Sequence, residues 1–138
     1  MTEELIAKSA APLRPRTDSR AAAVAIAGLL VPGLGHALLG MWGRALACFL
    51  SVGALVYAGA GMRGNLFSWQ SADAFSRLGF VADAGSGIFY LVAKSLEALG
   101  PDVSHSYGDY GTRFLATAGV LNLLAALHAY EAAKGHKA

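Results

Sequence analysis

The sequence predicts an all-α fold, an integral membrane bundle of about four transmembrane helices whose first helix is broken at Pro32-Gly33. Of its 138 residues, 55% are hydrophobic and only 14% are charged, whereas soluble domains carry roughly one quarter charged residues. Several apolar runs approach the ~20 residues that a helix needs to cross a bilayer. A soluble chain this short has too much surface to cover with so few charges. We therefore expect lipid around this chain rather than water.

Three regions follow from the distribution of charge along the chain. Residues 1–20 are polar and basic, residues 21–133 form a single transmembrane domain, and residues 134–138 are a basic tail. The expected spans are about 21–41, 43–62, 78–98 and 112–132.

The first span, 21–41, contains no acid, lysine or arginine and is interrupted only by His36. Its second half cannot be a regular helix, because proline removes a backbone donor and glycine frees the chain. The residues that break it are Pro32, Gly33, Gly35 and Gly40. A cleaved signal peptide is the alternative, but the basic lead is long for that role and a second apolar stretch follows at once.

The second span, 43–62, carries small residues on one face, which allow helices to approach closely in lipid. They are Gly53, Ala54, Ala58, Gly59 and Gly61. The connection 63–77 is amphipathic, so we expect it to lie along the membrane surface.

The third span, 78–98, contains Asp83 and a Gly-Ser-Gly interruption at 85–87, which predicts a short or broken crossing. A carboxylate in lipid is costly. Asp83 could take part in a proton relay with Lys94 or with another helix. We favour a role as the N-cap of a helix that starts near Ala84.

The fourth span, 112–132, places Asn122 at its centre, on a face otherwise made of Ala118, Ala125 and Ala129. Amide side chains bridge helices in membranes. We therefore expect a structural contact here rather than a substrate ligand.

Three further polar residues could carry chemistry. His128 and Glu131 share a face of the fourth span, which permits a proton relay or half of a metal site, but we favour an interfacial helix end with a local ion pair. The four-span topology puts His36 near the outer surface and His128 near the inner one, so the two should not meet. We expect His36 to bond a carbonyl freed by Pro32 or to face the headgroups.

Charge also orients the chain and excludes some functions. Lysine and arginine near the span ends number four in the first segment, two in the connection 63–77 and two in the tail, against one and none in the intervening turns. Both termini should therefore face the cytoplasm of a bacterial cell, with the protein in its inner membrane. Positive residues form no stripe with interleaved aromatics, which argues against nucleic acid as a partner. The single cysteine, Cys48, excludes an intrachain disulfide and a cysteine-based zinc cluster.

The stretch VPGLGHALLGMWGRAL at 31–46 resembles the Pro-Gly-x-Gly corner of small two-transmembrane-helix domains. The tail at 108–137 is similar to the closing helix of an uncharacterised family of small four-pass bacterial membrane proteins. That family has no assigned reaction or cofactor, so the resemblance implies an architecture alone. Where the family's closing pattern has Asp-Ala-Tyr, this chain has His128-Ala129-Tyr130.

We expect a non-enzymatic membrane component, an accessory or scaffold subunit that packs against itself or against other membrane helices. Its partners would be the bilayer and membrane proteins, with no catalytic, cofactor-binding or metal-binding residue and no identified small-molecule substrate. No nucleophile elbow, phosphate loop or His-Glu-x-x-His motif occurs. One alternative is a small oligomeric transporter or channel subunit that uses the broken first and third helices. Another is an intramembrane enzyme or metalloprotein that uses His36, His128 and Glu131.

Overall fold

The computed structural model describes residues 2–3, 18–97 and 106–135, and this part of the chain is all-α. Six helices follow one another between residues 18 and 133 of the described part: α2 (Asp18–Leu30), α3 (Leu34–Leu38), α4 (Trp42–Gly61), α5 (Ala74–Ala84), α6 (Ile88–Glu97) and α7 (Ser106–Ala133). The predicted fold class is therefore correct at the level of an all-helical chain, and the arrangement of the helices differs from a four-span bundle.

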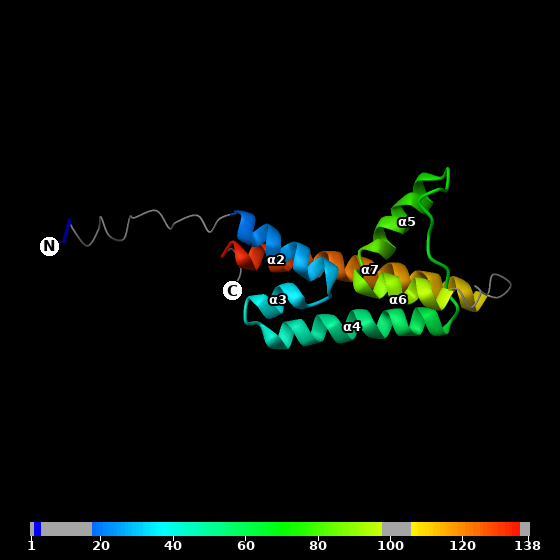
Figure 1. Cartoon of the computed structure of the whole chain (residues 1–138), viewed down its shortest axis with the longest axis horizontal. Coiled ribbons are helices and arrows are strands. Elements are labelled where there is room, and N and C mark those ends of the chain that lie inside the picture. The colour runs from blue at the N-terminus through cyan, green and yellow to red at the C-terminus, as the bar shows by residue number, and fades with distance from the viewer. Residues whose placement is uncertain (1, 4–17, 98–105, 136–138) are drawn as a thin grey trace.

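Two of the described helices are long and apolar enough to cross a membrane. They are α4 and the stretch Gly108–Ala133 of α7, of 20 and 26 residues. A helix of 20 residues is about 30 Å long, which matches the hydrocarbon thickness of a bilayer. The two helices run antiparallel beside each other and form the frame of the molecule (Figure 1).

The first predicted span is a hairpin of two short helices. Helix α2 ends at Leu30, and α3 then runs back along it, so that α4 starts at the end of the bundle where α2 starts (Figure 1). Pro32 cannot donate a backbone hydrogen bond, and Gly33 has a left-handed φ of 85°. The chain therefore reverses at these two residues instead of continuing across.

The third predicted span is a second hairpin, which enters from the opposite end of the bundle (Figure 1). Asp73 caps the start of α5 by accepting a hydrogen bond from the Ser76 amide. After α5, residues 85–87 turn the chain, with Gly87 at a φ of 65°, and α6 runs back outward. Helix α5 begins within the predicted connection 63–77, so the connection between helices ends at Asp73.

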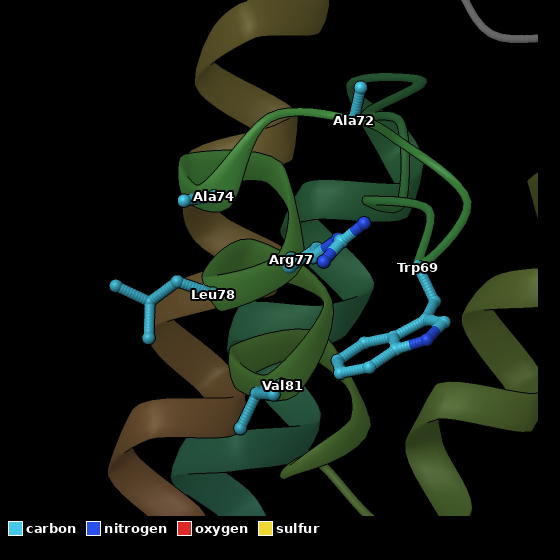
Figure 2. Close-up of a pocket in the computed structure, with 6 residues that line it drawn as sticks. All are labelled: Trp69, Ala72, Ala74, Arg77, Leu78 and Val81. Atoms are coloured by element: carbon cyan, nitrogen blue, oxygen red, sulfur yellow. The ribbon is translucent and has the colours of Figure 1, made fainter.

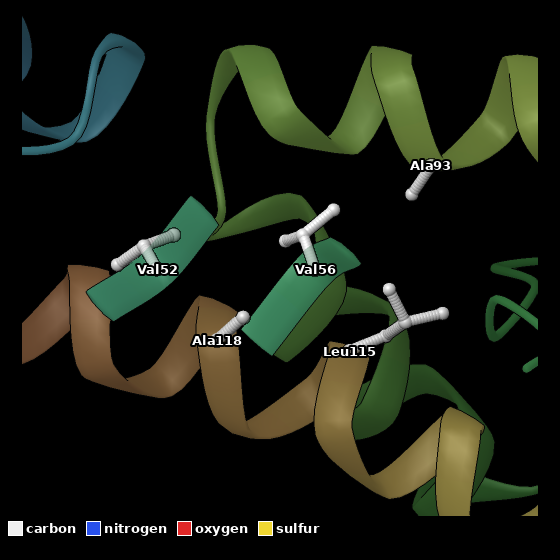
Figure 3. Close-up of a cluster of buried hydrophobic side chains, with 5 residues drawn as sticks. All are labelled: Val52, Val56, Ala93, Leu115 and Ala118. Carbon is white, nitrogen blue, oxygen red and sulfur yellow. The ribbon is translucent and has the colours of Figure 1, made fainter. Parts of the chain in front are cut away.

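Alanine and valine dominate the interior. One cluster joins α4, α6 and α7 through Val52, Val56, Ala93, Leu115 and Ala118 (Figure 3). A second cluster packs the start of α2 on the end of α7 through Ala21, Val24, Ala129 and Ala133. The start of α2 and the end of α7 therefore lie at the same end of the bundle, as four spans would also have required.

The crossing of α5 over α7 depends on Gly119. A Cβ added there would collide with the backbone oxygen of Ala82, whereas a Cβ on Gly43, near the start of α4, would meet nothing within 4 Å. We expect Gly119→Ala to lower the free energy of unfolding by roughly 1–3 kcal/mol through overpacking. Thermal unfolding of the detergent-solubilised chain, followed by circular dichroism, measures this. The control Gly43→Ala should be neutral or stabilising by up to about 1 kcal/mol, and equal melting of both variants would contradict the packing at Gly119.

Candidate functional site

The polar side chains buried in the described part of the chain lie where the two hairpins meet α7. Each is at most 3% exposed, and they are His36, Asp83, Ser86 and Asn122. The Ser86 hydroxyl bonds locally, donating to the Asp83 backbone oxygen at 2.7 Å. The other three connect elements that are distant in the sequence, so they define the candidate site.

Asn122 holds the inner ends of both hairpins. Its Nδ2 donates to the backbone oxygen of Leu29 at 3.0 Å and to that of Gly85 at 2.7 Å. These carbonyls belong to the C-terminal ends of α2 and α5, where a helix leaves acceptors without partners. A Cβ on Gly87 would collide with the Leu29 and Leu30 oxygens, so the two hairpin ends also touch each other.

His36 and His128 contact each other directly. Nε2 of His36 lies 3.0 Å from Nδ1 of His128, and the rings stack with centroids 5.3 Å apart at 20°. One neutral imidazole donates to the bare nitrogen of the other. The expectation that these residues stay apart is wrong, because it assumed that residues 21–41 cross the membrane. The reversal at Pro32 returns α3 to the half of the bundle that holds the end of α7.

The remaining candidates of the first segment shape the backbone. Pro32 is fully buried at the turn, where a Cβ on Gly33 would collide with the backbone of Ala45. Gly35 lies against the α2 backbone, where a Cβ would come within 2.7 Å of the Val24 oxygen. Gly40 has a φ of 77° and open space around it. These residues shape the turn between α2 and α3 and the connection from α3 to α4.

Glu131 lies one turn beyond His128 and is half-buried. Within the described residues, no group of three or more His, Cys, Asp or Glu side chains lies close enough to hold a metal ion. The two histidines therefore form a pair.

Asp83 lies in the last turn of α5, so the expectation that it caps a helix starting near Ala84 is wrong. Its Oδ2 accepts a hydrogen bond from the backbone amide of Phe67 at 2.7 Å, and its Oδ1 is buried without a partner. Lys94, the suggested relay partner, stacks over the Tyr90 ring at 5.9 Å.

Three successive backbone amides tie the connection after α4 to the bundle. Asn65 donates to Thr112 Oγ1 at 2.9 Å, and Leu66 donates to Glu97 Oε1 at 3.1 Å. With the Phe67 bond, side chains of α7, α6 and α5 hold consecutive residues. No sequence pattern pointed to Thr112 or Glu97, because their partners are backbone amides of an irregular connection.

Two hollows flank this connection. A groove of about 530 Å³ is lined by aromatic rings together with Lys94 and Glu97; the rings are Phe67, Trp69, Phe80 and Tyr90. A smaller hollow of about 360 Å³ lies between Trp69 and the outer side of α5 (Figure 2). There the Arg77 guanidinium lies 5.9 Å from the centre of the Trp69 ring.

Removing the amide at the hairpin junction should destabilise the fold. Asn122→Ala leaves the Leu29 and Gly85 oxygens without their donor, at a cost of about 1–3 kcal/mol. The matched control is Thr117→Ala on the same helix, whose hydroxyl donates only to Arg113 one turn away. Chemical or thermal unfolding in detergent should show a loss for Asn122→Ala well above that of the control. Similar stability of the two variants would mean that the amide does not hold the hairpins.

Comparisons with known proteins show the family alone. No curated protein and no solved structure matches the chain. Residues 23–138 match the family described as Family of unknown function (DUF6677). This match begins within α2 and covers the rest of the chain, so the chain belongs to that family.

Proposed function

We propose that this chain is an integral protein of the bacterial inner membrane, in which α4 and α7 cross the bilayer and each hairpin reaches halfway from one side. The distribution of side chains supports this. Eight of the twelve buried hydrophobic residues in the described part of the chain are alanines, whereas Leu46, Leu50 and Leu124 are each more than half exposed. Monomeric soluble proteins rarely expose such extensive apolar surface, and lipid tolerates it.

The positive-inside rule orients this arrangement. Residues 1–20 and 134–138, which adjoin the start of α2 and the end of α7, carry six of the eleven lysines and arginines. This end therefore faces the cytoplasm in our proposal, and the aromatic groove near Glu97 faces the opposite compartment.

Within the membrane, we assign the chain a non-enzymatic role as a component that binds other membrane helices through the outer face of α4. The observation that carries this role is an exposed face of small side chains at helical spacing. Its residues are Gly43, Ala47, Ser51, Ala54 and Gly61. A Cβ on Gly43 or Gly61 would meet nothing within 4 Å. Such faces let helices approach closely where lipid offers no hydrophobic drive for association.

The small residues of α4 serve two surfaces. Gly59 packs against Gly111 and Leu115 of α7, and Gly53 packs against Phe89 of α6. Packing inside the chain thus accounts for these two glycines and leaves the outer face to another helix.

Bulky side chains on this face should abolish association without harming the monomer. We expect the double substitution Ala47→Leu and Ala54→Leu to reduce the associated fraction at least several-fold, since the helices can no longer approach. Light scattering coupled to size exclusion in mild detergent, with identification of co-purifying proteins, measures this. The control is Val120→Leu on the outer side of α7, which is 44% exposed. An associated fraction that is equal in both variants would exclude the α4 face.

Transport of a small solute or ion is a second candidate, favoured by one observation. Two interrupted helical segments enter from opposite ends, and their ends meet at Asn122 in the middle of α7. Discontinuous helices that meet near the bilayer midplane build the substrate sites of many carriers.

This candidate predicts a loss of flux on neutralising the buried acid. Proteoliposomes that contain the wild-type chain and a Na⁺- or H⁺-sensitive dye should show flux, and Asp83→Asn should lower it at least tenfold. Asp73→Asn removes an exposed acid from the same helix and should not change it. Absence of flux in the wild-type chain, or unchanged flux in Asp83→Asn, counts against transport.

A further inference from the structure

The aromatic groove beside α6 contains one cation and one anion that do not pair with each other. Lys94 and Glu97 both line it, and they lie three residues apart on α6. The Lys94 ammonium lies 5.9 Å from the centre of the Tyr90 ring, and Glu97 Oε1 accepts the Leu66 amide at 3.1 Å. Among the described residues, neither side chain forms an ion pair. The groove therefore offers a ligand one charge of each sign.

Aromatic rings form the walls of this groove. The rings of Trp69 and Phe80 meet edge to face with centroids 5.8 Å apart, and those of Phe80 and Tyr90 do so at 6.1 Å. Edge-to-face packing of this kind is favourable and keeps the rings in place. The faces of aromatic rings attract ammonium groups, and the attraction grows when water is excluded. A ligand whose positive group carries an ammonium therefore finds both a carboxylate and ring faces here.

The smaller hollow on α5 continues the groove on the other side of Trp69, whose ring borders both (Figure 2). The Arg77 guanidinium lies against that ring, 5.9 Å from its centre. The other side chains that line the smaller hollow are apolar: Ala72, Ala74, Leu78 and Val81. A charged groove and an apolar hollow that share one wall suit an amphiphile, with its head in the groove and its chain in the hollow.

The groove lies at the headgroup level in the proposed membrane arrangement. Residues 65–70, which line it, follow soon after α4 ends at Gly61. The Asn65 amide donates to Thr112 Oγ1, near the start of the part of α7 that is long enough to cross. Tryptophan and tyrosine are enriched at this level of a membrane. Closer to the middle of the bundle, Leu91 of α6 is 62% exposed and offers apolar surface to an acyl chain.

We propose that the aromatic groove binds the phosphoethanolamine headgroup of a phospholipid, with Lys94 on the phosphate and Glu97 on the ammonium. An acyl chain then lies in the smaller hollow beyond Trp69. Residues three apart on a helix have Cβ atoms about 5–6 Å apart, and the two charges of this headgroup, joined by two carbons, are separated by a similar length.

The chemistry of Glu97 selects this headgroup over others. A purely anionic headgroup would bring a negative charge to the carboxylate without an ammonium to offset it. A choline headgroup has no N–H, whereas a primary ammonium can donate to Glu97 Oε2, which no described residue satisfies. The lipid site rests on the proposed membrane location, and it is independent of helix docking on α4 and of transport.

Quenching of Trp69 fluorescence by brominated phospholipids tests the site. The full-length chain carries Trp42→Phe, which leaves Trp69 as its one tryptophan, and is reconstituted in phosphatidylcholine vesicles. A fixed minor fraction of the lipid has brominated acyl chains and an ethanolamine, choline or glycerol headgroup. We expect brominated phosphatidylethanolamine to quench at least about twofold more than brominated phosphatidylcholine, because specific binding enriches this lipid around Trp69.

Two variants of the groove should remove this excess. Lys94→Gln and Glu97→Gln each delete one of the two charges, and glutamine at position 97 keeps an acceptor for the Leu66 amide. The matched control is Arg113→Gln. The Arg113 guanidinium also lies 5.9 Å from the centre of a tyrosine ring, that of Tyr110, but it does not line the groove. The control should keep the full excess.

Equal quenching by the ethanolamine and choline lipids overturns the proposal, as does an excess that persists in either groove variant. An equal excess with brominated phosphatidylglycerol overturns it in favour of a site for phosphate alone. Flotation of the vesicles distinguishes these results from an error in the location of the chain. A chain that does not float with the vesicles overturns the membrane location and the lipid site together, whereas a floating chain with equal quenching overturns the lipid site alone.

Discussion

The two hydrogen bonds donated by Asn122 hold this architecture together. A helix that ends inside a bundle exposes carbonyls that need donors, and in a membrane no water supplies them. The side-chain amide has two N–H groups on one nitrogen, and they serve Leu29 on one hairpin and Gly85 on the other. A hydroxyl has one donor and a carboxylate none. The chemistry of an amide therefore suits the middle of α7, where two helix ends arrive from opposite directions.

Close approach around this junction depends on glycine. A Cβ on Gly85 would come within 2.9 Å of the Gly119 oxygen, and one on Gly87 would collide with the end of α2. The amide can reach both carbonyls only because the hairpin ends come this near to α7 and to each other. The hydrogen bonds and the glycines thus form one constraint, and neither explains the junction alone.

Local sequence patterns located most of the helical segments. They did not predict in which direction the chain continues after each break. The apolar stretches found α4 and α7, and Pro32-Gly33 and residues 85–87 were recognised as breaks. A break marks where a helix stops. The residues against which the end of that helix packs decide where the chain goes next. Here that partner is Asn122, which lies 93 residues from Leu29 and 37 residues from Gly85. A pattern within one segment cannot report such a contact.

His36 and Asp83 were placed wrongly for the same reason, because their partners lie in distant segments of the chain. His36 was assigned to the wrong end of the bundle because its segment was taken to cross, and the reversal brings it to His128. Asp83 was taken for a cap because an acid inside the membrane needs a partner and the sequence identifies none. Its partner, the Phe67 amide, belongs to a connection without a regular pattern. Residue types identified these positions as unusual, and only the fold could pair them.

The buried polar groups of the two hairpins differ in how completely they are hydrogen-bonded. The histidine pair satisfies itself, because one imidazole donates and the other accepts. Asp83 gains a single amide bond and leaves an oxygen enclosed without a partner. A half-satisfied buried group is worse for stability than an apolar side chain of similar size. Hydrogen bonding between described residues therefore accounts for the histidines, whereas Asp83 and Asn122 each keep one enclosed oxygen without a partner.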